Sequence, residues 1–122
     1  MRKFSLGVLL ACVAATVIAV LLPASVTQVQ AATAAEEGKA LAFDRKKGNC
    51  LACHMIEGGD LAGNIGPPLL AMQQRFPDRT QLRAQIWDST VKNPQTMMPP
   101  FGRHRILTED EIDKIVDFLY TL

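Results

Sequence analysis

The string Cys50-Leu51-Ala52-Cys53-His54 restricts what this chain can be more than any other feature of its sequence. Two cysteines separated by two residues and followed at once by a histidine suggest three kinds of site. These are a disulfide, a zinc site and the attachment site of a c-type haem. Each kind of site needs different residues elsewhere, so the rest of the chain discriminates between them.

A disulfide or a zinc ion fits the rest of the chain poorly. A redox-active C-x-x-C usually opens a helix after a strand in a βαβ unit, and the sequence contains no clear strand periodicity of that kind. A structural disulfide closing so short a loop would constrain little chain, and it would leave His54 without a role. A zinc site needs four ligands, but Cys53 and His54 are neighbours, and His104 is the one further histidine.

A c-type haem uses all three residues of the motif. The thiols of Cys50 and Cys53 would add to the two vinyl groups on one side of the porphyrin, and the two intervening residues set that reach. His54 would then lie beneath the iron as an axial ligand. We therefore expect one covalently attached haem c.

The second axial ligand must come from elsewhere in the chain, unless that position is open. The candidates are Met55, Met72, Met97, Met98 and His104. The run Met97-Met98-Pro99-Pro100 predicts a stiff loop, because each proline fixes its own backbone dihedral. Such a loop suits an axial thioether, and Met98 is the predicted ligand, with Met97 as the alternative.

The first 31 residues predict a leader rather than part of the fold. A short basic start precedes an apolar run from Phe4 to Ala24 and then small residues, as in a secretory signal peptide. We expect cleavage after Ala31, or else after Ala34, and a periplasmic protein. An uncleaved membrane anchor or lipid attachment at Cys12 are the alternatives.

Residues 32–122 are then the single folded domain. Removal of residues 1–31 takes two of the 13 basic residues and none of the 12 acidic ones, which leaves a net charge of about −1. This balance argues against a surface for nucleic acid or anionic lipid.

Helical periodicity predicts an all-α domain with three helices, over about 34–45, 79–91 and 109–122. Asp78 with Gln81, and Thr108 with Glu111, are typical of helix N-terminal capping boxes. Gly38 and Ala42 lie four apart and would let another helix approach closely, so we expect the terminal helices to pack together. Residues 58–78 and 93–102 are expected to be loops.

Three further features allow a structural or a functional role. Trp87 could donate its indole N–H to a haem propionate or simply bury its ring. The arginines at positions 75, 79 and 83 form a four-residue repeat that favours a solvated face over a binding stripe. The run Arg103-His104-Arg105 adjoins the methionine loop, where we expect contact with a partner protein.

The whole pattern resembles class I cytochromes c. The motif near the start, the methionine–proline loop before the last helix and the segment Gly66-Pro67-Pro68-Leu69 all match that family. The resemblance implies that the terminal helices pack together around the haem. It also implies that the Pro67 carbonyl accepts a hydrogen bond from the His54 ring, and that Leu69 lines the haem pocket.

A closer resemblance is to the SoxX family, carried by "GNCLACHMI", "GNIGPPL" and the stretch from Asn93 to the C-terminus. It implies the monohaem subunit of a heterodimeric SoxAX complex, an L-cysteine S-thiosulfotransferase that couples thiosulfate to a cysteine of the SoxYZ carrier. SoxA-type subunits carry the catalytic haem, so this chain would pass electrons to another cytochrome and supply no catalytic residue. The alternatives are a free-standing periplasmic electron carrier, for example to a terminal oxidase, and a haem-based ligand sensor.

Overall fold

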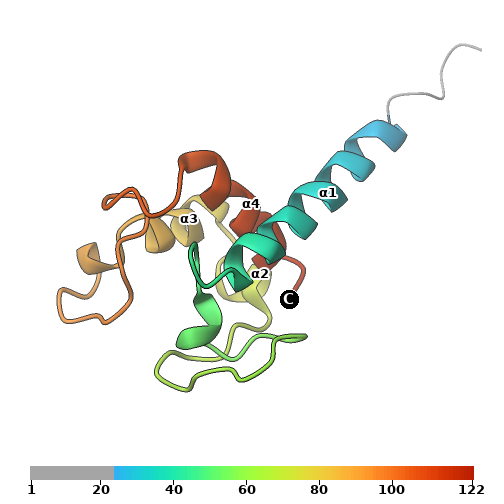
Figure 1. Cartoon of the computed structure of the whole chain (residues 1–122). Helices are drawn as coiled ribbons and strands as arrows, with labels where there is room; N and C mark the ends of the chain where they lie inside the picture. Colours follow the sequence, from blue (N-terminus) through green and yellow to red (C-terminus); the bar gives the residue numbers. More distant parts are fainter. Residues whose placement is uncertain (1–23) are drawn as a thin grey trace, which may run out of the picture.

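The structure, a computed structural model, describes residues 24–122, with side chains described from Thr33 onward. The described part is helical, with no strand and one isolated parallel bridge between Ile56 and Leu69. In chain order the elements are α1 (Ala24–Phe43), the 3₁₀ turn η1 (Cys50–Ala52), α2 (Met72–Arg75), α3 (Arg79–Trp87), the 3₁₀ turn η2 (Ser89–Val91) and α4 (Glu109–Leu119) (Figure 1). The expectation of an all-α fold is confirmed.

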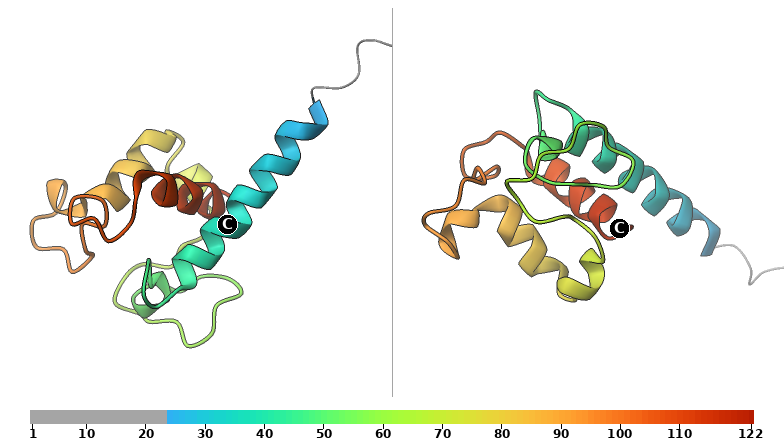
Figure 2. Two further views of the ribbon diagram at one scale, coloured as in Figure 1. Left: turned by 45° about the horizontal axis from the view of Figure 1, so that its top comes forward. Right: turned by 90° about the horizontal axis from the view of Figure 1, so that it is seen from below.

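The terminal helices α1 and α4 pack against each other, as the sequence predicts (Figures 1 and 2). Gly38 makes this possible, because a Cβ built there would lie 1.9 Å from the backbone oxygen of Lys114 in α4. One turn later, Ala42 is fully buried. The Lys114 ammonium pairs with Glu37 of α1 at 2.8 Å, so an ion pair flanks the close approach.

Helix α4 begins with the predicted capping box. The Thr108 hydroxyl accepts the Glu111 N–H at 3.2 Å, and the Glu111 carboxylate accepts the Thr108 N–H at 2.9 Å. Glu111 also pairs with Lys47 at 2.6 Å, which ties the turn after α1 to the start of α4. These hydrogen bonds hold the pKa of Glu111 below its ordinary value, the bond from Lys47 contributing most.

Helix α3 is bound to α4 through arginines. Arg79 pairs with Asp117 at 2.6 Å and donates to the Asp113 carbonyl at 3.0 Å. Arg83 pairs with the Asp113 carboxylate at 2.7 Å and with Glu109 at 3.0 Å. The arginine repeat is therefore neither a free solvated face nor an open binding stripe at these two positions.

Buried side chains from the four α-helices and from the segments between them form one core. The fully or almost fully buried members are Ala42, Ile56, Met72, Leu82, Ile86, Phe101, Leu107, Ile112, Ile115, Val116, Phe118 and Leu119. The C-terminus is fastened to the same core by two hydrogen bonds. The Tyr120 hydroxyl donates to the Phe76 carbonyl at 2.7 Å, and the Leu122 carbonyl accepts the Met72 N–H at 3.1 Å.

Two predicted helix boundaries were wrong, and one short helix was not predicted. Helix α1 begins at Ala24 rather than near residue 34, and its first turns project beyond the rest of the domain (Figures 1 and 2). Helix α3 ends at Trp87 rather than near residue 91, because the Asp88 side chain accepts the Thr90 N–H and starts η2 instead. The short helix α2 lies inside a segment expected to be a loop.

The predicted leader falls mostly outside the described residues, and residues 24–31 are the part of it that the structure includes, as the start of α1. Within residues 24–122, no helix is both long enough and apolar enough to span a bilayer.

Candidate functional site

The C-x-x-C-H motif forms a tight turn packed directly on α1. Asn49, in the left-handed conformation with φ 47°, precedes η1. The Cys50 carbonyl accepts the N–H groups of Cys53 at 3.2 Å and of His54 at 2.9 Å. A Cβ on Gly48 would lie 2.9 Å from the Leu41 carbonyl oxygen, so only glycine lets the chain pass this close to α1.

The two thiols of this turn are free and half-buried. Desolvation raises the pKa of Cys50 to about 11, and the neighbouring Cys53 adds a smaller effect in the same direction. Cys50 is therefore a neutral thiol at physiological pH. A redox-active C-x-x-C needs a thiolate of lowered pKa, so this environment does not favour thiol–disulfide exchange.

The His54 ring is oriented by a backbone carbonyl. Its Nδ1 lies 2.7 Å from the Pro67 oxygen. Because a carbonyl oxygen can only accept, the proton must be on Nδ1. In the neutral ring, Nε2 then keeps its lone pair for a metal ion, and the carbonyl fixes the orientation of the ring. This is the contact that the resemblance to class I cytochromes c implied for Pro67.

The segment that supplies Pro67 lies along the motif. The Gly66 N–H donates to the Cys53 carbonyl at 2.8 Å, and the Leu69 N–H donates to the Met55 carbonyl at 2.9 Å. A Cβ on Gly66 would lie 2.4 Å from Cε1 of the His54 ring, so the backbone fits against the imidazole only because residue 66 is glycine. The structure thus brings Cys50, Cys53, His54, Pro67 and Leu69 into one assembly.

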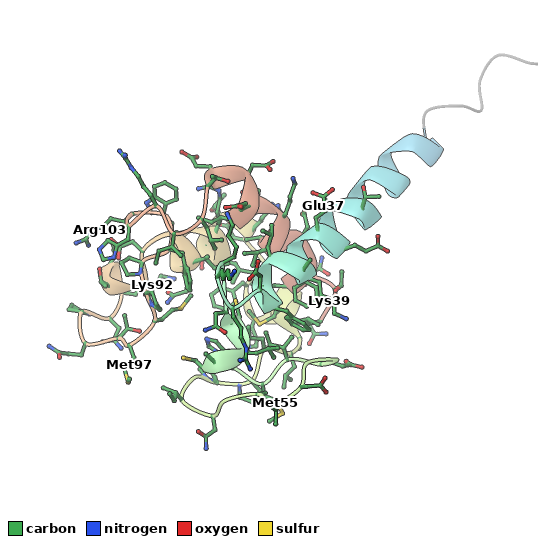
Figure 3. The ribbon with its side chains drawn as sticks, viewed as in Figure 1. Glu37, Lys39, Met55, Lys92, Met97 and Arg103 are labelled. Carbon is green, nitrogen blue, oxygen red and sulfur yellow. The ribbon has the colours of Figure 1, made fainter. Side chains whose placement is uncertain are left out.

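The predicted sixth ligand lies on a different segment, anchored separately. Met98 is half-buried and packs against the core, whereas the side chain of Met97 is 75% exposed and points away from the protein body (Figure 3). Met72 is 2% exposed and belongs to the core, and Met55 is 59% exposed. Of the five candidates, Met98 is the thioether held both partly buried and on a loop.

The residues around this loop have structural partners. Gly102 packs on the Trp87 ring, since a Cβ there would lie 2.1 Å from Cε3. The Arg83 guanidinium lies 5.7 Å from the centroid of the same ring. Arg103 pairs with Asp88 at 3.0 Å, while His104 is exposed.

Residues 35–122 match the protein family described as Cytochrome c. This chain belongs to the cytochrome c family. Members of this family carry covalently bound haem c, and they are typically exported proteins. The fold is accordingly that of a class I c-type cytochrome, with its helices and without strands in the described part.

One solved structure and one further protein are similar to this chain. One chain of the crystal structure of SoxXA from P. pantotrophus superimposes with a TM-score of 0.63 and 28% identity, over 70% of this cytochrome and 79% of that chain. An uncharacterized lipoprotein of Aquifex aeolicus (strain VF5) is 38% identical over 76 residues. This cytochrome spans 37% of the length of that relative, and the match covers 62% of its own length. The resemblance to SoxX is thus supported by structure.

The residues present fit a c-type haem. The two free thiols lie on one turn, the adjacent imidazole is held in the tautomer that leaves Nε2 available, and Gly66 leaves room for that ring. Within residues 24–122, no group of three or more His, Cys, Asp and Glu side chains is gathered as a metal-only site would need. If the haem iron takes two protein ligands, His54 would be one of them and Met98 is the candidate for the other.

Two residues that were not predicted from the sequence, Ser89 and Thr96, contact the backbone of Met98. No sequence signal distinguishes Ser89 from any other serine after a helix. Gly66 appeared only as the first residue of the G-P-x-L segment, although its lack of a side chain is what admits His54.

Proposed function

We propose that this cytochrome is an electron-transfer protein with one haem, attached through Cys50 and Cys53 and ligated by His54 and Met98. We further propose that it is the electron-transfer subunit of a SoxAX-type complex in the periplasm. The observation that carries the ligation by His54 is the 2.7 Å contact between His54 Nδ1 and the Pro67 oxygen. A histidine held in this way is a typical axial ligand with its orienting acceptor.

When bound, the haem supplies a one-electron couple at its iron. The protein residues set the conditions for that couple. His54 presents Nε2, and the Pro67 carbonyl fixes the orientation of the ring. Met98 would supply a thioether, a ligand that raises the potential of a c-type cytochrome. If His54 and Met98 both bind the iron, no position would remain for a substrate, which favours electron transfer over ligand sensing.

The structural similarity to SoxXA supports the role as a subunit. In such a complex this chain would bind a SoxA-type haem subunit as a heterodimer. The complex would act as an L-cysteine S-thiosulfotransferase on a SoxYZ-type carrier, and this chain would pass electrons to a further cytochrome. Both cysteines of residues 24–122 would be consumed by haem attachment, so the sulfur chemistry would belong to the partner.

The test is purification of the tagged holoprotein, under gentle conditions, from its native cells grown on thiosulfate. We expect a second c-type cytochrome in equal amount, with thiosulfate-dependent activity toward a cysteine-bearing carrier. A lone monomer reduced by many donors would contradict the subunit role and favour the alternative of a free-standing carrier. Rapid carbon monoxide binding by the reduced native protein would contradict Met98 ligation and favour a sensor.

A further inference from the structure

Ser89 is the only polar side chain that is buried among the side chains the structure describes, with 0% of its surface exposed. A buried hydroxyl without a partner is costly, and this one has a partner. Its Oγ donates to the Met98 carbonyl at 2.8 Å. The buried hydroxyl therefore acts on the residue proposed as the sixth ligand.

Ser89 also holds the other end of the same loop. Its carbonyl oxygen accepts the N–H of Asn93 at 3.1 Å. The loop from Asn93 to Met98 is thus closed at both ends on one residue, through the backbone at its start and through the hydroxyl at its end. A loop whose two ends are fixed in this way has few alternative conformations.

Thr96 provides a second attachment for Met98. Its Oγ1 accepts the Met98 N–H at 3.1 Å. Both backbone polar groups of Met98 are therefore bonded to hydroxyl side chains rather than to a helix or a sheet. The following residue, Pro99, further restricts the backbone of Met98 to extended conformations.

The residues just before Ser89 hold the chain that follows the loop. The Trp87 carbonyl accepts the N–H groups of Gly102 at 3.1 Å and Arg103 at 3.3 Å. The Asp88 carboxylate pairs with the Arg103 guanidinium at 3.0 Å. Three successive residues at the junction between α3 and η2 thus hold this region. Trp87 and Asp88 hold the chain that follows the methionine loop, and Ser89 contacts the loop and Met98 itself.

We propose that Ser89, assisted by Thr96, is a positioning residue that keeps Met98 on the haem iron. This inference rests on the proposed ligation by Met98 and deepens it. The net contribution of a single hydrogen bond of this kind to stability is enough to shift an equilibrium by on the order of fivefold. Loss of the Ser89 hydroxyl should therefore raise the fraction of molecules with Met98 dissociated by on the order of fivefold.

The experiment compares the holoprotein with Ser89→Ala and Thr96→Val, and uses Tyr120→Phe as the matched control. The control also removes one hydroxyl that donates to a backbone carbonyl, at 2.7 Å, but far along the chain from the loop. The readouts are the rate of carbon monoxide binding to the reduced protein and the ferric charge-transfer band of methionine-ligated iron. Amide hydrogen exchange at Met98 measures the opening of the loop independently of the haem.

Both test variants should bind carbon monoxide on the order of fivefold faster than wild type, lose the charge-transfer band at lower pH and exchange the Met98 amide faster. Tyr120→Phe should leave all three unchanged. If Ser89→Ala fails to incorporate haem, the result for Thr96→Val alone tests the positioning role. Test variants that behave like Tyr120→Phe would overturn the inference.

A Met98→Ala variant separates this inference from the proposed ligation. If Met98→Ala leaves carbon monoxide binding and the charge-transfer band as in wild type, Met98 is not the ligand and the proposed ligation fails. If Met98→Ala opens the iron while Ser89→Ala and Thr96→Val have no effect, the ligation stands and the positioning role is refuted.

Discussion

Replacement of Gly38 by alanine tests the packing of the terminal helices, because it adds one methyl group at their closest approach. That methyl carbon would lie 1.9 Å from the Lys114 backbone oxygen and 2.4 Å from the Lys114 carbonyl carbon. Ordinary van der Waals contact begins at 3.4 Å, so the difference from 1.9 Å requires α1 and α4 to separate by about 1.5 Å. The clashing atoms are backbone and cannot rotate away.

The expected cost follows from two opposing effects. Overpacking of a buried contact costs about 1–3 kcal/mol, and this site belongs at the upper end because the interface must open. Alanine in place of glycine within a helix returns about 1 kcal/mol through propensity. The net expectation is a loss of about 2 kcal/mol, which lowers the Tm of a domain of this size by roughly 8–16 °C.

The assay is thermal unfolding of the haem-containing protein, with Ala40→Gly as the control. Ala40 is exposed on the same helix, so its replacement by glycine reports propensity alone and should cost about 1 kcal/mol. If propensity alone acted at residue 38, Gly38→Ala would stabilise the protein. A Tm equal to or above that of wild type would therefore refute the packing argument.

Three further outcomes are expected. Met98→Ala should open the iron to carbon monoxide and lower the potential in redox titration, whereas Met97→Ala should do neither; the reverse pattern would move the ligand to Met97. Gly66→Ala should displace the His54 ring, because the new Cβ would lie 2.4 Å from Cε1, and should reduce haem incorporation measured by pyridine haemochrome; full incorporation with an unchanged spectrum would contradict this. The folded-state pKa of Glu111 is lowered, so its contribution to stability is complete above its ordinary pKa of 4.5 and is lost as pH falls through the lower folded value. Urea unfolding of Glu111→Gln should therefore differ from wild type at neutral pH and converge with it in acid, and a constant difference would exclude the titration.

Local signals predicted the parts of the fold that depend on neighbouring residues. The capping box at Thr108 and Glu111 was confirmed, because a helix N-terminus is defined by side chains close together in the sequence. Helix α3 does start after Asp78, but the Asp78 side chain accepts the Thr80 N–H instead of forming the expected capping box with Gln81. The end of α3 was not predicted correctly, because Asp88 can equally continue a polar helix surface or start a new turn. The conformation at Asp88 depends on its ion pair with Arg103, which lies fifteen positions away in the chain.

The roles of other residues depend on partners that are distant in the sequence and become visible only in the structure. The repeat of Arg79 and Arg83 has the spacing of any solvated face, and only their acidic partners on α4 assign them to holding two helices together. The close approach at Gly38 was predicted, since a small residue on a helix face has few other uses. The roles of the haem-site residues stay predictions, which the variants at positions 66, 97 and 98 address.

The pairing of α1 with α4 also determines when folding of this protein can be completed. The chain is made from its N-terminus, and α1 has to wait for a partner that begins at Glu109. Until then the loop between them is unclosed, and closing so long a loop is the entropic step that comes before the core contacts reward it. Cys50 and Cys53 appear early, so the proposed haem attachment at these residues would have the whole interval before the last helix arrives. Late closure of the core would thus leave time for the proposed covalent modification at two residues that the completed fold half-buries.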